Sequence, residues 1–141
     1  MDYRKLITRR FWGHAMSFPF IWLPVFPILL LDLCIEVYQQ ICFPIYGLEM
    51  VKRSNYIQIR DRAKLRYLTG LEKIDCMYCG YVNGVLLYWK EVAGRTEKYW
   101  CGIMHANKPG FQTHQDQLDK NYARYDDEKD FQDKFGAGGS D

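Results

Sequence analysis

The chain has 141 residues and a mass of 16.8 kDa, enough for one small domain or for such a domain with an added apolar element. Hydrophobic residues make up 48% and aromatic residues 16%, so the composition excludes a disordered, collagen-like or low-complexity protein. The formal net charge of +2 argues against a strongly electrostatic nucleic-acid binder. Five cysteines are an odd number and too few for a disulfide scaffold, which indicates a reducing compartment or a metal site.

Hydropathy and charge divide the chain into three regions. Residues 1–50 combine a basic start with a long apolar block, and residues 51–111 hold a basic linker and three of the five cysteines. Residues 112–141 form an acidic tail with a predicted short helix over 126–135. We therefore expect a mainly α fold with little β, in which an N-terminal apolar helical hairpin is followed by a small metal-stapled domain.

The apolar block is the longest uncharged stretch of the chain. Residues 11–31 carry no formal charge over 21 positions, a length that would span a bilayer as a helix. Prolines argue against one unbroken helix, because each lacks an amide donor and clashes with the preceding turn. These prolines are Pro19, Pro24 and Pro27. We predict two antiparallel segments, 11–27 and 28–46, that join at the last two of them.

Basic residues stand on both sides of this block. Arg9 and Arg10 precede it, and Lys52 and Arg53 follow it. Positive flanks stay on the cytoplasmic side, so both ends should emerge on that side of a membrane. The sequence thus predicts a membrane-associated protein on the cytoplasmic face with lipid as a partner. Two alternatives are a soluble core and a cleavable signal, although no small-residue cleavage site is present.

A polar stripe runs along the second apolar segment. Asp32, Glu36, Gln39 and Gln40 have the i, i+4, i+7, i+8 spacing of one helix face. The two carboxylates could bind a cation or a basic group of a partner. In the alternative interpretation they are the solvated side of an interfacial helix. We expect the stripe to face lipid headgroups, the soluble domain or a partner.

The linker and the region after it contain four predicted features. The basic run Lys52–Lys73 suits either anionic lipid headgroups or a solvated face. YIQIR at 56–60 alternates like a strand, and residues 61–69 resemble a short helix. After Asn83-Gly84, residues 85–100 should form an amphipathic helix.

The strongest chemical pattern is a pair of short motifs, CMYCGY and CGIMH, with the overall spacing C-x2-C-x21-C-x3-H. Two thiolates separated by two residues can hold one metal, and the glycine after the second permits the tight turn of a knuckle. The second motif would supply the other two ligands of a closed tetrahedral site. The predicted zinc ligands are Cys76, Cys79, Cys101 and His105.

CMYCGY resembles the C-x-x-C-G knuckle of rubredoxins and zinc ribbons, over about ten residues. The whole chain also resembles a small bacterial membrane-associated protein. The knuckle resemblance implies zinc, with iron as the alternative. CGIMH departs from the family because a histidine replaces its fourth cysteine, and rubredoxin-type electron transfer depends on four thiolates around iron.

Other interpretations of the cysteines stay open. Cys76 and Cys79 could form a redox dithiol, and Cys101 and His105 could be ordinary buried residues. The remaining candidates are His114 as a substitute ligand and Cys34 and Cys42 as buried small hydrophobes.

Common catalytic motifs are missing from the sequence, including G-x-G-x-x-G, the Walker loop, H-E-x-x-H and G-x-S-x-G, so an enzyme is not favoured. We expect a membrane-associated accessory or scaffold protein with a structural zinc site, which binds a partner protein or a lipid surface. The alternative is a small membrane-tethered redox protein that uses iron or a dithiol at Cys76/Cys79. Nucleic acid is not an expected partner.

Overall fold

The computed structural model describes residues 3–59, 61, 64, 66, 68, 70–113 and 115–136, with side chains from Trp12 on except that of His14. These residues are mainly helical, as predicted, and contain one isolated parallel β-bridge between Ile103 and Ala123. The helices are α1 (Tyr3–Trp22), α2 (Val25–Tyr46), the short 3-10 helix η1 (Arg53–Asn55), α4 (Gly70–Trp100), α5 (Gln115–Asp119) and α6 (Glu128–Phe135).

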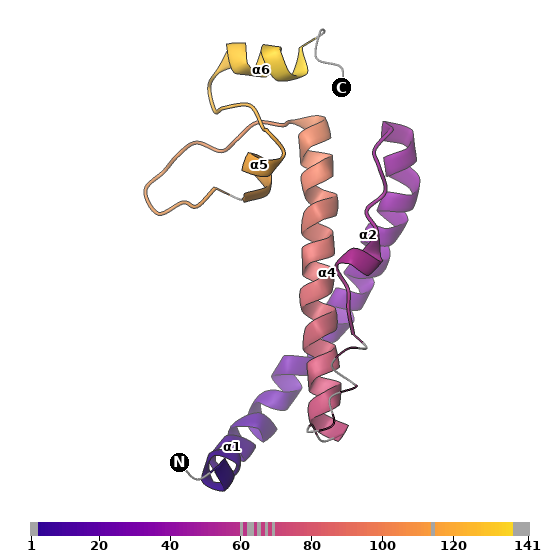
Figure 1. The fold of residues 1–141 in the computed structure, drawn as a ribbon, viewed down its shortest axis with the longest axis vertical. Coiled ribbons are helices and arrows are strands. Elements are labelled where there is room, and N and C mark those ends of the chain that lie inside the picture. Colours follow the sequence, from indigo (N-terminus) through magenta and orange to yellow (C-terminus); the bar gives the residue numbers. More distant parts are fainter. Residues whose placement is uncertain are drawn as a thin grey trace.

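Helices α1 and α2 follow one another as a long bent rod (Figure 1). The Leu23 amide donates to the Pro19 carbonyl at 3.0 Å, and the Ile28 amide donates to the Pro24 carbonyl at 3.0 Å. The helical hydrogen bonds therefore continue up to the bend from one side and resume at once on the other.

The predicted antiparallel hairpin of residues 11–27 and 28–46 is wrong, because the chain bends between α1 and α2 without reversing. Pro24 precedes the first residue of α2, and Pro27 lies in its first turn. Amides in a first turn have no carbonyl partner within the helix, so a proline there sacrifices no hydrogen bond. These two prolines are compatible with the start of a helix.

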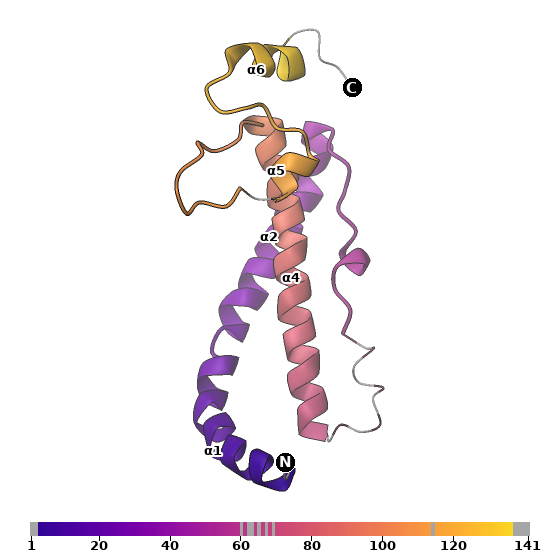
Figure 2. The same cartoon turned by 60° about the vertical axis from the view of Figure 1, so that its left-hand side comes forward.

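The second helix ends at Gly47, whose φ of +69° is the left-handed conformation that favours glycine. The Gly47 amide donates to the Pro44 carbonyl at 3.3 Å, and the Leu48 amide donates to the Phe43 carbonyl at 2.9 Å. The chain then turns back along α2. We call residues 48–59, which include η1, the strap (Figure 2).

Helices α2 and α4 lie side by side and run in the same direction (Figures 1 and 2). Tyr38 is hydrogen-bonded to Thr96, and further along Tyr46 stacks on Tyr99, so contacts advance together along both helices. The parallel arrangement depends on the strap, which leads the chain back toward the start of α4. The buried core lies along this junction and contains Phe43, Val51, Tyr88 and Val92.

Helix α4 is one continuous helix of 31 residues, so the helix predicted over 85–100 is confirmed but begins earlier, at Gly70, and runs through Asn83-Gly84. Gly84 is buried against the strap. A Cβ atom there would lie 2.8 Å from the Tyr56 carbonyl oxygen and 2.9 Å from the Ile57 Cα. The missing side chain thus admits the strap backbone, and this packing compensates for the low helix propensity of glycine.

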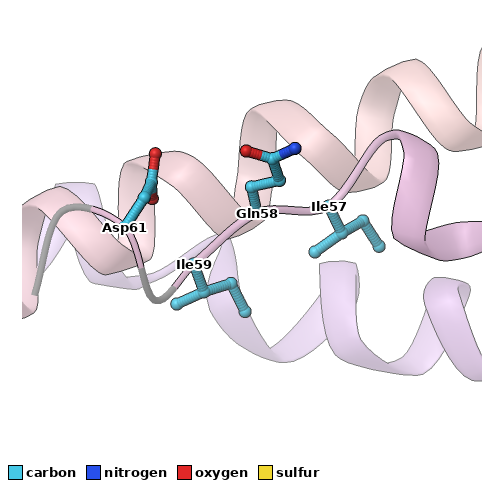
Figure 3. Close-up of a pocket in the computed structure, with 4 residues that line it drawn as sticks. All are labelled: Ile57, Gln58, Ile59 and Asp61. Carbon is cyan, nitrogen blue, oxygen red and sulfur yellow. The ribbon is translucent and has the colours of Figure 1, made fainter.

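The predicted strand over 56–60 has no partner strand within the described part of the chain. The strap side chains nevertheless alternate there. Ile57 and Ile59 point to one side and Gln58 to the other (Figure 3). They line an open pocket of about 360 Å³ together with Asp61. The predicted helix over 61–69 falls largely outside the described residues.

The C-terminal segments pack at the far end of α4. The Ala123 amide donates to the Gly102 carbonyl at 2.7 Å, which ties the segment after α5 to the end of α4. The short helix predicted over 126–135 is confirmed as α6. The Asp127 side chain caps it by accepting from the Asp130 amide at 3.0 Å.

We expect Gly84→Ala to lower the free energy of unfolding by about 1–3 kcal/mol, because its methyl group would overlap the strap backbone. Gly13→Ala is the matched control, since a Cβ there meets nothing within 4 Å in the middle of α1. Denaturant unfolding in mild detergent, followed by far-UV circular dichroism, measures both. Equal effects of the two substitutions would contradict the close approach of strap and α4.

Candidate functional site

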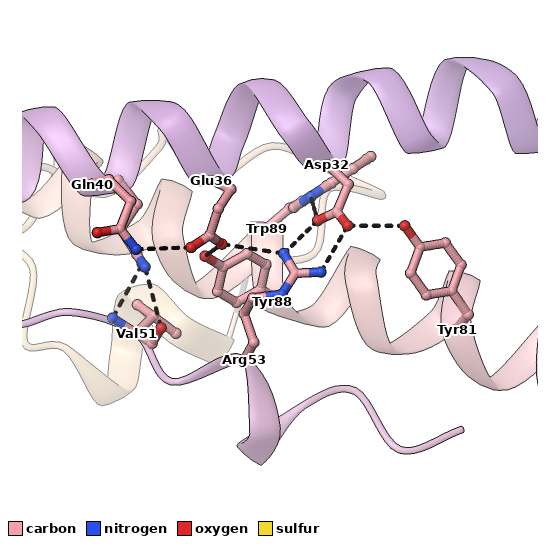
Figure 4. A network of polar contacts seen from close by, with 9 residues as sticks. Asp32, Glu36, Gln40, Val51, Arg53, Tyr81, Tyr88 and Trp89 are labelled. Atoms are coloured by element: carbon pink, nitrogen blue, oxygen red, sulfur yellow. Dashed lines mark hydrogen bonds and ion pairs between the residues drawn. The ribbon is translucent and has the colours of Figure 1, made fainter. Parts of the chain in front are cut away.

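A polar network joins α2, the strap and α4 near the middle of the molecule (Figure 4). Its charged and hydrogen-bonding members are Asp32 and Glu36 from α2, Arg53 from η1, and Tyr81, Tyr88 and Trp89 from α4.

The carboxylate of Asp32 is the centre of the network. Both terminal nitrogens of Arg53 donate to its two oxygens at 2.8 Å, the bidentate geometry of a strong ion pair. The Tyr81 hydroxyl donates to Asp32 Oδ2 at 2.9 Å, and Trp89 Nε1 donates to Oδ1 at 3.4 Å. Asp32 is 7% exposed, so these donors replace most of the water that a carboxylate would otherwise bind.

The second carboxylate extends the network by one helical turn. Glu36 Oε2 accepts from Arg53 at 3.2 Å and from the Tyr88 hydroxyl at 2.9 Å. Gln39 meets the strap beside it, where its amide group donates to the Val51 carbonyl at 3.2 Å and accepts from the Val51 amide at 3.1 Å. The strap is thereby held to α2 through both its side chains and its backbone.

The tyrosines of the network remain neutral over the ordinary pH range. Burial, followed by the hydrogen bond to Asp32, raises the pKa of Tyr81 to about 12. Burial and the hydrogen bond to Glu36 likewise raise the pKa of Tyr88 to about 12. The Arg53 guanidinium also lies 5.0 Å from the centre of the Tyr88 ring, within cation–π distance. Both hydroxyls therefore act as donors to carboxylates.

Asp32, Glu36 and Gln39 of the predicted polar stripe face the rest of the chain, one of the environments expected for the stripe. Gln40 is exposed and donates to Glu36 on the same helix at 2.9 Å. Arg53 occupies the position between the two carboxylates where a bound cation would lie. Sequence reasoning missed the partners on α4. Tyr81 and Tyr88 are seven residues apart and share one helix face, a spacing that could have indicated a hydroxyl row.

A second polar cluster joins α4 to α5. Glu91 accepts from Arg95 at 2.8 Å and from Lys120 at 2.9 Å. Burial alone would raise the pKa of Glu91, but these two hydrogen bonds outweigh it and lower the pKa. The Tyr122 hydroxyl donates to the Gly94 carbonyl at 2.8 Å. The cluster orders the segment after α4.

The structure does not bring the predicted zinc ligands together. Cys76 and Cys79 lie in α4, Cys101 follows the last residue of that helix, and His105 comes four residues later. Cys101 lies 25 positions after Cys76, a separation of about 37 Å at a rise of 1.5 Å per residue. In the described part of the chain no three potential ligands are grouped for a metal. Zinc binding, iron binding and the dithiol alternative stay predictions.

The other cysteines and histidines have varied surroundings. Cys34 is exposed and Cys42 half-buried, so the expectation of two buried cysteines is wrong for Cys34. It lies on the face of α2 that the rest of the chain leaves uncovered. The His105 ring packs edge-on against Phe111 at 5.5 Å, and His114 lies outside the described residues.

We expect Arg53→Met to lower the free energy of unfolding by about 2–3 kcal/mol, because it leaves a buried carboxylate without its charge partner. Lys52→Met is the matched control, an adjacent exposed residue that loses the same charge. Arg53→Lys should restore part of the stability, since it keeps the charge but not the bidentate fork. Thermal and denaturant unfolding measure all three. Similar losses for Arg53→Met and Lys52→Met would contradict the ion pair.

A thiol-protection experiment tests the zinc prediction against the continuous α4. If α4 stays continuous in the reduced protein, Cys101 should react with a thiol reagent equally fast with and without zinc, because the helix holds it far from Cys76. Peptide mass spectrometry reports each cysteine. Joint protection of Cys76, Cys79 and Cys101 by one zinc ion, with loss of helical circular dichroism, would establish the four-ligand site and show that α4 breaks to form it.

Comparison of the chain with protein-family models, curated proteins and solved structures found no match. The rubredoxin-like and zinc-ribbon-like knuckle therefore gains no support from relatives. The function is inferred from the contacts and surfaces of this chain.

Proposed function

We propose that the protein is a membrane-associated scaffold, in which α1 and α2 bind lipid and the C-terminal part of the chain meets a partner protein. The observation that carries this proposal is the uncovered apolar surface of α2. Among the described residues, Ala15–Tyr46 is the helical run that is long and apolar enough to cross a membrane, and 6% of its most apolar window is buried.

The uncovered surface forms a stripe along α2. Successive exposed residues are three or four positions apart, so they lie on one side of the helix. They are Phe26, Leu30, Leu33, Val37, Ile41 and Ile45. Trp12, Met16 and Phe20 continue the apolar surface along α1, and each is more than 70% exposed. A soluble monomer rarely exposes so extended an apolar patch, whereas a lipid surface would cover it.

Two alternatives fit the structure less well. The core helix of a soluble domain would be mostly buried, unlike α2. A cleavable signal would be separable from the domain, but α2 supplies Asp32, Gln39 and Phe43 to the buried interior. Removal of the apolar helix would therefore dismantle the fold. The second alternative function, a membrane-tethered redox protein, has no contact at Cys76 or Cys79 that favours it.

Charge indicates the side of the membrane, and exposed aromatic surface indicates where a partner protein would bind. Basic residues on both sides of the apolar block favour the cytoplasmic face. The surface offered to a protein partner is the polar end formed by α5, α6 and the end of α4, far from α1 (Figure 1). Trp100 is 67% exposed at this end, and exposed aromatic residues of this kind often anchor protein interfaces.

We expect the purified protein to float with phospholipid vesicles on a density gradient and Ile41→Asp to lower the bound fraction by about tenfold, because the substitution places a charge on the apolar stripe. Leu118→Asp on α5 is the matched control, since Leu118 is 50% exposed and Ile41 is 57% exposed. Circular dichroism verifies that both variants fold. Flotation that Ile41→Asp leaves unchanged, or no flotation of the natural sequence, would contradict the proposal.

A further inference from the structure

We infer, on the basis of the proposed membrane association, that α2 lies along the membrane surface and does not cross it. The inferred ligand is the boundary between headgroups and acyl chains of a bilayer. The apolar stripe faces the acyl chains, and the strap and α4 face water. Two observations on the side of α2 opposite the stripe lead to this orientation.

The first observation is an ion triad at the middle of the apolar run. Asp32 and Glu36 are near the midpoint of Ala15–Tyr46, and Arg53 pairs with both. The Arg53 side chain is 36% exposed and that of Glu36 is 31% exposed, so the chain itself does not enclose them. If α2 crossed the bilayer, these charges would lie at mid-depth beside lipid, where ionised groups are strongly unfavourable.

The second observation is the strap, which is non-helical over most of its length and lies beside the same part of α2 (Figure 4). Its exposed side chains are polar. They belong to Glu49, Lys52, Ser54, Asn55 and Gln58. Irregular backbone at bilayer depth is tolerated only where protein or a water-filled cavity surrounds it. These exposed groups are compatible with water or headgroups and incompatible with acyl chains.

Polarised infrared spectroscopy of the natural chain in oriented bilayers measures the orientation. Because α2 and α4 run side by side and make up most of the helix, the amide I dichroism of the whole protein reports their common direction. We expect helix axes close to the membrane plane. Axes close to the membrane normal would overturn the inference. In that case a second copy of the chain or another protein would have to cover the strap within the bilayer.

Site-specific labelling gives an independent readout. Gly13→Cys and Glu49→Cys introduce thiols near the two ends of the apolar run. Both positions are exposed, and the Glu49 side chain is 87% exposed. With protein added to preformed vesicles, we expect a membrane-impermeant reagent to label both to within about twofold of each other. Peptide mass spectrometry separates them from the native cysteines.

Labelling of only one of the two sites would show a crossing. The outcomes separate the two proposals, because a protein that does not float contradicts membrane association itself. A protein that floats but stands upright or hides one site contradicts only the orientation along the surface.

Discussion

The bidentate ion pair between Arg53 and Asp32 joins the three parts of the chain on which the fold depends. Asp32 belongs to α2, Arg53 belongs to the strap, and Tyr81 and Trp89 of α4 donate to the same carboxylate. A buried carboxylate needs such donors, because water no longer solvates it. The pair therefore determines which face of α2 turns inward. The opposite face of a mostly apolar helix is then left uncovered.

The strap is the second requirement of the arrangement. Parallel neighbouring helices need a connection that returns the chain from the end of one to the start of the other, and the strap, residues 48–59, leads the chain back from the end of α2. Gly84 makes room for the strap backbone, and Gln39 hydrogen-bonds to both backbone groups of Val51. Gln39 thereby satisfies the backbone groups of buried Val51, as buried polar groups require.

These contacts divide the molecule into an apolar face and a polar face. The stripe on α2, continued by α1, has no cover within the described chain, whereas the strap and the α4–α5 cluster expose charged and polar groups. The proposed scaffold function follows from this division. The apolar face suits acyl chains, and the polar face with the end of α4 suits water and a protein partner. One internal ion pair thus connects the stability of the fold with the position of the protein at a membrane.

Local sequence determined the features that depend on neighbouring residues. The helical content, the apolar block, the spacing of Asp32 and Glu36 and the capped helix α6 follow from periodicity and end signals within a few turns. Only the tertiary structure decided what distant segments do to one another. Arg53 and Tyr81 reach Asp32 from 21 and 49 residues away, and strap packing keeps Gly84 inside α4 although its sequence context favours a turn. The same continuous helix separates the two cysteine motifs, because motif spacing contains no information on whether the intervening residues fold back or extend.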